Sequence, residues 1–584
     1  MDKSVTILIG GEAGQGLLTV GQLLSRVLVR SGYHIVVTQD YMSRIRGGHN
    51  TFAVRASGVP IWAPRESVDI LIAFDARSVN EHIRNLNDGG IIIMNADEQA
   101  DTEGVSCLRV PVASLGKPAL FNIMAAGVAG ALPGALAEEA GNELDIRLFL
   151  PFHADIKRKD PPLGLLGTFS VPYGTKAFSV ELFVTELQGL KTYLLDSEVF
   201  NHNSPVYHGD PALDGRKYAA FSVALLEAAR FLGWQPDIVH ANDWHTALAV
   251  YALKTLYKED PFFGKTRSLL TIHNLPFNGY GSEFAITELG FPLSSDADLP
   301  DWARLTPLPL GISAADQIVT VSPNYAREIQ TRDFGCGLHE YLQKNKHKLT
   351  GILNGIDTKI WNPAVDPYIL HHYDSTDLSG KAQNKAALQR ELNLEENPEI
   401  PLLTVVSRLD YQKGIGLIFD AIPENVRKSW QMLLLGTGAP DLEARAADLM
   451  RQFPRKIVSL LRFDERMAHK IYAAGDIFIM PSLYEPCGLS QMIAMRYGSI
   501  PVARATGGLQ DSIINYQKDP EKASGFLFTE KTYEGLVNAL NSAILLFRDK
   551  DAWTRLMSNA MQGDFSWKAS AQNYWNSYQE LIKE

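Results

Sequence analysis

Residues 481–508, PSLYEPCGLSQMIAMRYGSIPVARATGG, decide the fold of the chain around them. A short apolar run at residues 477–480 precedes them and reads as a buried parallel strand. The loop around Glu485 opens a helix, and a second short strand at residues 500–503 ends in a glycine pair before a further helix. Two successive strand–loop–helix units predict an α/β fold with a carboxylate and two helix N-termini at the carboxyl edge of a parallel sheet. We expect a diphosphate to bind the backbone N–H groups there while Glu485 faces the attached sugar. The alternative is an ordinary sheet edge with a solvated glutamate.

Length and composition describe a globular chain of several domains. The 584 residues suffice for about three or four domains of ordinary size. Hydrophobic residues make up 46% of the chain and charged residues 21%, as in soluble globular proteins. The net charge of −11 argues against nucleic acid and anionic membranes as partners, because both bind basic surfaces. No apolar run reaches the ~18 residues that a membrane-spanning helix needs.

Cysteine usage and the first residues predict a cytoplasmic protein. Cys107, Cys336 and Cys487 lie far apart and match no metal-ligand spacing, so the chain cannot by itself ligate a four-cysteine iron–sulfur cluster. The chain starts almost directly with a strand and lacks the apolar segment of a signal peptide. We therefore expect a cytoplasmic location, no metal site and no iron–sulfur cluster.

The first quarter of the chain has the pattern of a small doubly wound, Rossmann-like sheet. A strand at residues 5–9 runs into the glycine-rich turn 10–16, and a helix at residues 17–31 leads to a second strand at residues 34–38. Further strands are expected at residues 51–55, 70–74 and 90–95. The glycines follow GxxGxG rather than GxGxxG, which leaves nicotinamide binding as the weaker interpretation.

Four motifs of this quarter resemble the gamma subunit or gamma domain of 2-oxoacid:ferredoxin oxidoreductases. They are GEAGQG at residues 11–16, SRIRGGH at 43–49, VDILIAFD at 68–75 and NIMAAG at 122–127. The resemblance implies partner chains that hold the thiamine diphosphate and the clusters, or else a docking or regulatory module. The candidate anion-binding residues are Gly11, Gly14, Gly16, Arg44 and Arg46. The two arginines could equally be solvated or cap a partner surface.

Residues 128–584 resemble the bacterial glycogen synthase and plant starch synthase family, which are retaining glucosyltransferases of the GT-B fold. Besides residues 481–508, the motifs that carry the resemblance are DIVHANDWH at 237–245, TIHNL at 271–275, GILNGID at 351–357 and SRLDYQKG at 407–414. The resemblance implies an α/β architecture of two Rossmann-like domains with a C-terminal crossover helix. The expected domains are a gamma-like domain at 1–127, an acceptor-side domain at 128–385, a nucleotide-sugar domain at 386–565 and the crossover helix at 566–584.

Two cations near residue 410 suggest how the transfer proceeds without a metal ion. A departing nucleoside diphosphate develops negative charge that must be neutralised in the transition state. Arg408 and Lys413 lie five residues apart across a strand-to-helix turn, so both can point into the cleft and supply that charge. The alternative is a pair of cations on the surface.

The resemblance assigns further residues of this chain to the site. Glu485 would hydrogen-bond the sugar hydroxyls and steady the positive charge on the glucosyl ring, and His245 would line the cleft beside that ring. The expected substrate-binding residues are Asp243, His273, Asn274, Cys487, Gly488, Leu489, Thr506, Gly507 and Gly508. Cys487 would contribute packing and backbone position, and glucosyl transfer would need no cofactor.

The sequence departs from the family at its first strand. Synthases begin with a strand and a Lys-x-Gly-Gly-Leu loop, whose lysine is understood to contact the donor diphosphate. Residues 121–125 stand where that loop belongs, and they contain neither a lysine nor a glycine pair. A parallel sheet without a central strand exposes apolar surface and unpaired backbone groups, so another segment must fill the gap or the sheet must close without it.

Three interpretations follow. The first is a glycogen or starch synthase, a hexosyltransferase that transfers glucose from ADP-glucose or UDP-glucose to the non-reducing end of an α-1,4-glucan with retention. The second is a catalytically impaired scaffold whose N-terminal domain docks or regulates a 2-oxoacid:ferredoxin oxidoreductase. The third is a joining of two reading frames that has no meaning as one protein. The occurrence of His245, Arg408, Lys413 and Glu485 in family order favours the first.

Overall fold

The protein is described by a computed structural model in which the chain forms two compact units, Met1–Phe121 and Asn122–Glu584. The described residues are 4–12, 24, 28, 33–41, 49–57, 59, 61, 63, 65, 67–73, 76–95, 102, 105–110, 132, 135–136, 144–157, 162–174, 176–187, 190–200, 205–425 and 429–583. Residues 121–125, which stand where the family has its Lys-x-Gly-Gly-Leu loop, lie outside the described residues.

The N-terminal unit is built on a six-stranded sheet in the order β2-β3-β1-β4-β5-β6. The five strands expected from the sequence are present, and β1 pairs with β4 in parallel. β3, however, lies antiparallel between β1 and β2. The sheet is therefore mixed: β3 pairs in the antiparallel direction with both β2 and β1, whereas β4 pairs in parallel with β1. The elements are β1 (Ser4–Glu12), β2 (His34–Tyr41), β3 (His49–Ser57), β4 (Val68–Ala73), α2 (Ala76–His82), β5 (Leu86–Asn95) and β6 (Ser106–Val110).

Alternating side chains of this sheet pack on its two faces. Leu8 belongs to a buried cluster with Val79 of α2. Its neighbour Ile9 belongs to another cluster, against which the helical residues Leu24 and Leu28 pack. Successive residues of a strand point to opposite faces, so both faces of the sheet are covered.

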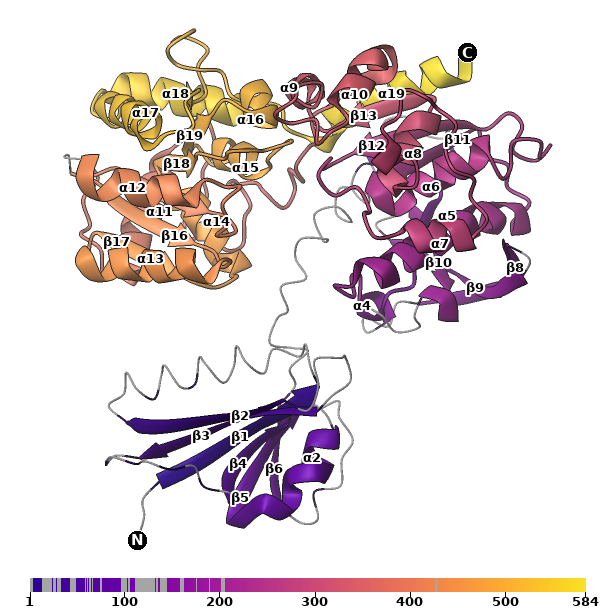
Figure 1. Cartoon of the computed structure of the whole chain (residues 1–584). Helices are drawn as coiled ribbons and strands as arrows, with labels where there is room; N and C mark the ends of the chain where they lie inside the picture. Colours follow the sequence, from indigo (N-terminus) through magenta and orange to yellow (C-terminus); the bar gives the residue numbers. More distant parts are fainter. Residues whose placement is uncertain are drawn as a thin grey trace. The chain divides into compact units, whose positions relative to one another are not determined.

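The first lobe of the second unit runs from β7 to β14 (Figure 1) and contains two four-stranded sheets. One has the order β7-β10-β9-β8 with mixed pairing, and the other is the parallel sheet β11-β12-β13-β14. The long helix α5 begins at Pro211, where the side chain of Asp210 accepts the Ala212 N–H and proline lacks the N–H that would be left unpaired. The strands are β7 (Leu148–Pro151), β8 (Gly164–Tyr173), β9 (Lys176–Leu187), β10 (Leu190–Asp196), β11 (Ile238–Asn242), β12 (Arg267–Ile272), β13 (Gln317–Thr320) and β14 (Leu349–Gly351), and the helices are α4 (Ala154–Lys157), α5 (Pro211–Phe231), α6 (Asp243–Lys254), α7 (Glu283–Glu288), α8 (Pro307–Ala314), α9 (Pro323–Glu328) and α10 (His339–Lys344).

Two strands of the first lobe have a single partner strand each among the described residues. Among the described residues, β7 pairs only with β10 and β11 pairs only with β12. In β11 the side chains of Ile238, Val239 and His240 are half-buried, whereas Leu269 and Leu270 of β12 are fully buried. The absence of the family's first strand stays a prediction, because residues 111–131 lie outside the described part of the chain.

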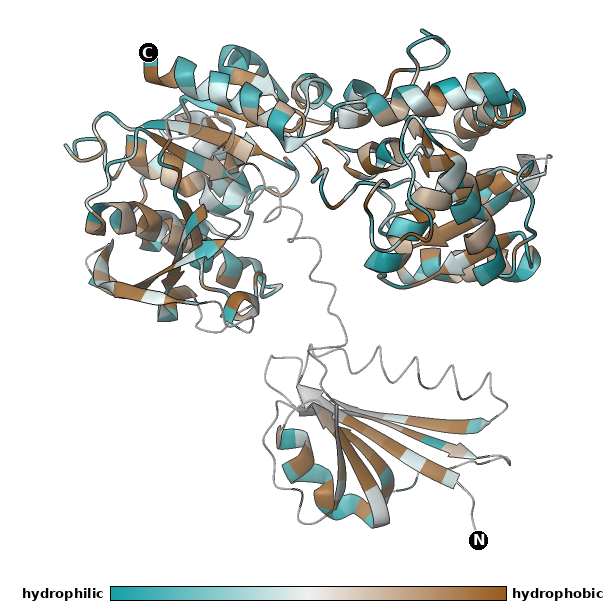
Figure 2. Ribbon diagram, turned by 180° about the vertical axis from the view of Figure 1, so that it is seen from behind, coloured by the Kyte–Doolittle hydropathy of each residue, from teal (hydrophilic) through white to brown (hydrophobic). Residues whose placement is uncertain are grey.

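The second lobe runs from α11 to α18 around one parallel sheet in the order β17-β16-β15-β18-β19-β20. β15 and β18 occupy the residues predicted for them and are almost entirely buried. Figure 2 shows these strands as hydrophobic, with hydrophilic residues concentrated on the surrounding helices. The strands are β15 (Leu402–Val406), β16 (Gln431–Leu435), β17 (Ile457–Leu460), β18 (Ile477–Met480), β19 (Ile500–Arg504) and β20 (Phe526–Phe528), and the helices are α11 (Ser379–Glu391), α12 (Ile415–Asn425), α13 (Pro440–Gln452), α14 (Glu465–Ala474), α15 (Ser490–Arg496), α16 (Gly507–Ser512), α17 (Tyr533–Leu546) and α18 (Lys550–Gln562).

The last helix, α19 (Trp567–Lys583), returns to the first lobe, as Figure 1 shows. Tyr574 and Leu581 of α19 are buried in one cluster with Leu269 of β12 and Val319 of β13. The hydroxyl of Tyr578 also lies 2.6 Å from Nδ1 of His240. The chain therefore crosses from the second lobe back to the first, as the sequence predicted.

Candidate active site

Adjacent strands of the second lobe bring a lysine and a glutamate together. β15 and β18 are parallel neighbours, so the loops that follow them leave the same edge of the sheet. Nζ of Lys413, after β15, lies 2.6 Å from Oε2 of Glu485, after β18. The same oxygen accepts a hydrogen bond of 3.0 Å from the hydroxyl of Ser482. Only 6% of the Glu485 side chain is exposed, so this carboxylate depends on these donors for its solvation.

Arg408 lies on the same turn and is more exposed. Its guanidinium is 2.9 Å from Oδ2 of Asp410, and 44% of its side chain is accessible. Burial lowers the pKa of Arg408, whereas the negative charges of Asp410 and Glu485 raise it. Arg408 and Lys413 thus both interact electrostatically with Glu485, which is the grouping that the sequence predicted.

Backbone carbonyls of the loop before Glu485 are held by two side chains that sequence reasoning missed. Arg504, at the end of β19, donates hydrogen bonds of 2.7 Å to the carbonyls of Ser482 and Leu483. Gln412 donates to the carbonyl of Tyr484 at 3.1 Å. Three consecutive carbonyls are therefore fixed, which limits the positions that Glu485 can take. A cation directly before the ATGG sequence was the available signal.

The glycine pair after β19 lets the two loops touch. A Cβ on Gly507 would lie 1.9 Å from the Glu485 carbonyl oxygen, and one on Gly508 would lie 2.1 Å from the Cys487 carbonyl oxygen. The preceding residue, Thr506, is fully buried, and its hydroxyl donates to Glu328 of the first lobe at 3.0 Å. The close approach demands glycine at both positions, because either side chain would overlap backbone atoms.

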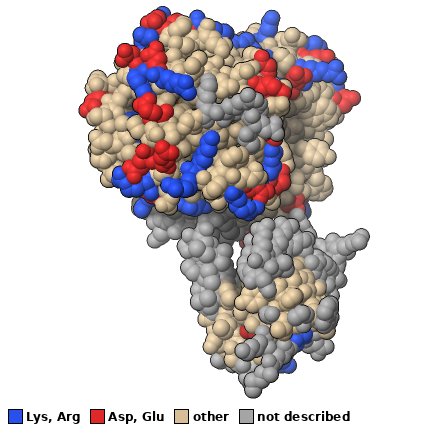
Figure 3. All heavy atoms as spheres, turned by 90° about the vertical axis from the view of Figure 1, so that its left-hand side faces the viewer, with Lys and Arg blue, Asp and Glu red and all other residues tan. Residues whose placement is uncertain are grey.

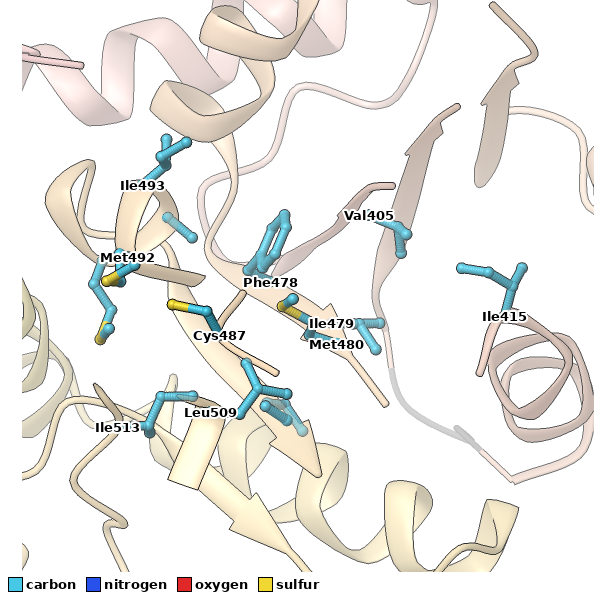
Figure 4. Close-up of a cluster of buried hydrophobic side chains, with 14 of the residues drawn as sticks. Val405, Ile415, Phe478, Ile479, Met480, Cys487, Met492, Ile493, Leu509 and Ile513 are labelled. Atoms are coloured by element: carbon cyan, nitrogen blue, oxygen red, sulfur yellow. The ribbon is translucent and has the colours of Figure 1, made fainter. Parts of the chain in front are cut away.

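The surroundings of Cys487, Gly488 and Leu489 indicate that these residues contribute packing and backbone position. Cys487 is buried among apolar side chains of β18, α15 and α16 (Figure 4), and burial raises the pKa of its thiol to about 12. Gly488 has a φ of +71°, which favours glycine, and Leu489 precedes the first residue of α15. At neutral pH the thiol is therefore protonated and inert.

In the first lobe, Asp243 braces the turn that carries His273 and Asn274. Its carboxylate accepts the N–H of His273 at 2.7 Å and that of Asn274 at 3.3 Å, and burial raises its pKa. Nε2 of His273 lies 2.9 Å from Oδ1 of Asn242. Oδ1 of Asn274 is buried, and no hydrogen bond within the described residues reaches it. Asp243 itself has a φ of +52°, a strained conformation of the kind that clusters at functional sites.

His245 belongs to a separate buried cluster. Its Nε2 is hydrogen-bonded to the hydroxyl of Tyr207. Burial, together with the charges of His273 and Lys217, lowers the pKa of His245 to about 3, so the imidazole is neutral at pH 7. No hydrogen bond or ion pair between described residues joins His245 to Glu485.

One face of α5 anchors the loop that presents Tyr207. Nζ of Lys217 donates to the carbonyl of Pro205 at 2.7 Å and to Nδ1 of His153 at 2.9 Å. The hydroxyl of Tyr218 donates to the carbonyl of Val206 at 2.7 Å, and the carboxylate of Asp214 accepts the backbone N–H of His208 at 2.8 Å. Positions 214, 217 and 218 share one helix face, so a single turn of α5 fixes the loop. No sequence motif indicated this loop.

The remaining predicted residues lie apart from these. Gly11 is in β1, opposite Asn50 of β3, whereas Gly14, Gly16, Arg44 and Arg46 lie outside the described residues. In the part of the chain that the structure describes, no three His, Cys, Asp or Glu side chains converge as metal ligands would. No described helix is both long and apolar enough to cross a membrane. On the face shown in Figure 3, cationic and anionic side chains are interspersed over the second unit, without the continuous basic surface that nucleic acids bind.

Three segments match known protein families. Residues 125–344 match the family described as starch synthase catalytic domain, and residues 400–545 match glycosyl transferases group 1. Residues 6–144 match the family described as pyruvate ferredoxin/flavodoxin oxidoreductase.

Relatives that cover most of this chain agree with the starch synthase match. The chain is 38% identical over 464 residues to a glycogen synthase of Syntrophotalea carbinolica, covering 78% of this chain and 95% of the relative. It is 38% identical over 461 residues to a glycogen synthase of Clostridium perfringens, covering 78% and 94%. Among solved structures, it resembles the catalytic domain of starch synthase IV from Arabidopsis thaliana bound to ADP and acarbose. That likeness has 33% identity and a TM-score of 0.69, and it covers 78% of this chain and 95% of that one.

Proposed function

Because this chain belongs to the glycogen and starch synthase family, we propose that it transfers glucose from ADP-glucose to the non-reducing end of an α-1,4-glucan with retention of configuration. ADP is the nucleotide named with the related starch synthase structure, which favours ADP-glucose over UDP-glucose as donor. The observation that carries the proposal is the buried ion pair of 2.6 Å between Lys413 and Glu485, with Arg408 on the same turn.

The chemistry follows from these charges. A leaving nucleoside diphosphate gains negative charge as the glycosidic bond breaks, and fixed cations in a partly dehydrated site stabilise it more strongly than water does. Arg408 and Lys413 supply two such cations. Glu485 is the carboxylate next to them and stabilises the positive charge that develops on the sugar ring. We propose that this arrangement serves in place of a metal ion and that glucosyl transfer needs no cofactor.

Lys413 must divide its hydrogen bonds between two anions during the reaction. In the structure its ammonium group binds Glu485. An ammonium group has three donors, so Lys413 can bind a phosphate oxygen while it keeps Glu485 in place. Ser482, whose hydroxyl also donates to Glu485, holds the carboxylate if Lys413 turns toward the phosphate.

The test is incorporation of radiolabelled glucose from ADP-glucose into glycogen by the purified chain, with UDP-glucose in a parallel assay. We expect incorporation by the parent and a loss of about 10²–10³-fold in Glu485→Gln. Glu391→Gln is the matched control, since Glu391 forms an exposed ion pair with Lys470 in the same lobe. Absence of incorporation by the parent, or equal rates in the parent and Glu485→Gln, would contradict the proposal.

For the N-terminal unit we propose association with subunits of a 2-oxoacid:ferredoxin oxidoreductase. The match of residues 6–144 to an oxidoreductase family supports this. Copurification of such subunits with the intact chain, and not with a chain that begins at residue 122, is the expected result. Their absence from both would contradict it. We propose that the protein acts in the cytoplasm.

A further inference from the structure

Helix α9 is where the first lobe contacts the two loops of the candidate site. The hydroxyl of Ser322, at its start, donates to the carbonyl of Pro486 at 2.6 Å. Asp511 of α16 accepts the Asn324 N–H at 2.6 Å. In return, Glu328 accepts the N–H of Gly507 at 3.0 Å, at the start of α16. Each helix thus supplies a carboxylate to the N-terminus of the other, and the two lie side by side (Figure 1).

A pair of tyrosines forms a further bridge within this contact. The hydroxyl of Tyr325, which is fully buried, is hydrogen-bonded to the hydroxyl of Tyr484. The Tyr325 oxygen also accepts the N–H of Leu275 at 3.0 Å. Tyr484 directly precedes Glu485, and Leu275 directly follows the turn of His273 and Asn274. The path from that turn to the carboxylate loop therefore consists of one backbone N–H and two hydroxyl groups.

We propose that Tyr325 and Tyr484 are positioning residues: their hydroxyl pair sets the distance between the Glu485 loop of the second lobe and the His273–Asn274 turn of the first. The proposal rests on the proposed function, because it assumes that Glu485 faces the transferred sugar. Without the hydroxyl pair, the distance between the Glu485 loop and the His273–Asn274 turn is no longer set, although each lobe keeps its own fold.

The surrounding contacts make the bridge separable from folding. The rings of Tyr325 and Tyr484 meet edge to face with centroids 5.7 Å apart, and Phe334 stacks on Tyr484 at 6.0 Å. These contacts survive in Tyr484→Phe, which removes only a hydroxyl. The bonds of Ser322, Glu328 and Asp511 continue to join the lobes. Burial raises the pKa of both tyrosines, so both hydroxyls are neutral and available as donors.

The experiment compares Tyr484→Phe, Tyr325→Phe and the double variant for kcat and KM in glucosyl transfer, together with Tm. We expect kcat of Tyr484→Phe to fall about five- to tenfold, with the KM for ADP-glucose and the Tm unchanged. The double variant should lose little more than Tyr325→Phe, because both substitutions break the same bridge. Tyr251→Phe is the control: it loses a part-buried hydroxyl bond of 2.9 Å to the carbonyl of Pro292 within the first lobe, and kcat should not change.

An unchanged kcat in Tyr484→Phe, or a loss of kcat accompanied by an equal loss in Tyr251→Phe, overturns the proposal. A second measurement, hydrogen exchange of the Leu275 amide, does not require that the chain transfers glucose. If the parent chain does not transfer glucose, the proposed function fails, and exchange alone decides the inference. Faster exchange at Leu275 in Tyr484→Phe than in the parent shows that the bridge couples the lobes, and equal exchange shows that it does not.

Discussion

The two lobes hold their functional side chains in different ways. In the second lobe one uninterrupted parallel sheet places β15 beside β18, and the loops after these strands bring Lys413 to Glu485. Among the described residues of the first lobe, the strands form two sheets, and β7 and β11 each pair on one side only. There the loop that presents Tyr207 to His245 is held by side chains of α5. Neighbouring parallel strands thus bring the charged pair of the second lobe together directly, whereas the loop that carries Tyr207 in the first lobe is fixed by side chains of a helix.

The largest effect that separates the lobes should come from removing Lys413. Lys413→Met deletes a cation that faces Glu485, and we expect kcat for ADP-glucose to fall about 10²–10³-fold, as for loss of one donor to a developing oxyanion. Lys470→Met, which breaks only an exposed ion pair, is the control and should retain the parent rate. Steady-state kinetics check both, and a parent-like Lys413→Met would assign the charge neutralisation to another group.

The next largest effect should come from Arg504, which holds two backbone carbonyls of the Glu485 loop. Arg504→Lys should lose at least one of the two hydrogen bonds to the carbonyls of Ser482 and Leu483. A hydrogen bond to a charged group contributes about 1.5–3 kcal/mol, and we expect a destabilisation of that size in the second lobe. Denaturant unfolding, followed by hydrogen exchange in β18 and β19, measures it. Stability within a few tenths of a kcal/mol of the parent would show that Gln412 suffices.

Acidification should destabilise the first lobe more than the second. Burial lowers the pKa of His153 and of His245 to about 3, from an ordinary value of 6.5. The unfolded chain therefore binds protons below pH 6.5 that the folded lobe does not. The resulting stability is complete above pH 6.5 and is lost as the pH falls toward 3, by up to about 1.4 kcal/mol per pH unit for each histidine.

Hydrogen exchange at pH 7 and pH 5 localises this loss. We expect first-lobe amides to lose more protection than amides of β15 and β16. His245→Gln removes one titrating group and should reduce the difference. Equal losses in both lobes would indicate that acid acts on the chain generally.

The smallest expected effect is a difference in amide hydrogen exchange between β11 and β15. β11 pairs on one side only among the described residues, whereas β15 pairs on both. We expect several β11 amides to exchange faster than those of β15, since unpaired N–H groups are open to water. Equal protection would show that a segment outside the described residues covers the edge of β11.

Parts of this architecture were predictable because they depend on local patterns. The strands at residues 402–406 and 477–480 occur where the apolar runs place them. The meeting of Lys413 and Glu485 followed from the rule that parallel strands end at one edge. The antiparallel insertion of β3 was missed, because a strand's sequence does not state the direction of its neighbour. The bridge between Tyr325 and Tyr484 was also missed, since its members are 159 positions apart.

The amino-acid sequence alone indicated the family, the positions of β15 and β18 in the second lobe and the charged groups proposed for its site, because apolar periodicity and loop chemistry act over short distances. Only the tertiary structure decided that Ser482 and Arg504 hold the Glu485 loop, that α5 anchors Tyr207 and that α9 joins the lobes. These contacts depend on distances between segments that are remote in sequence. Such distances arise only when the sheets and helices pack and their buried polar groups must find partners.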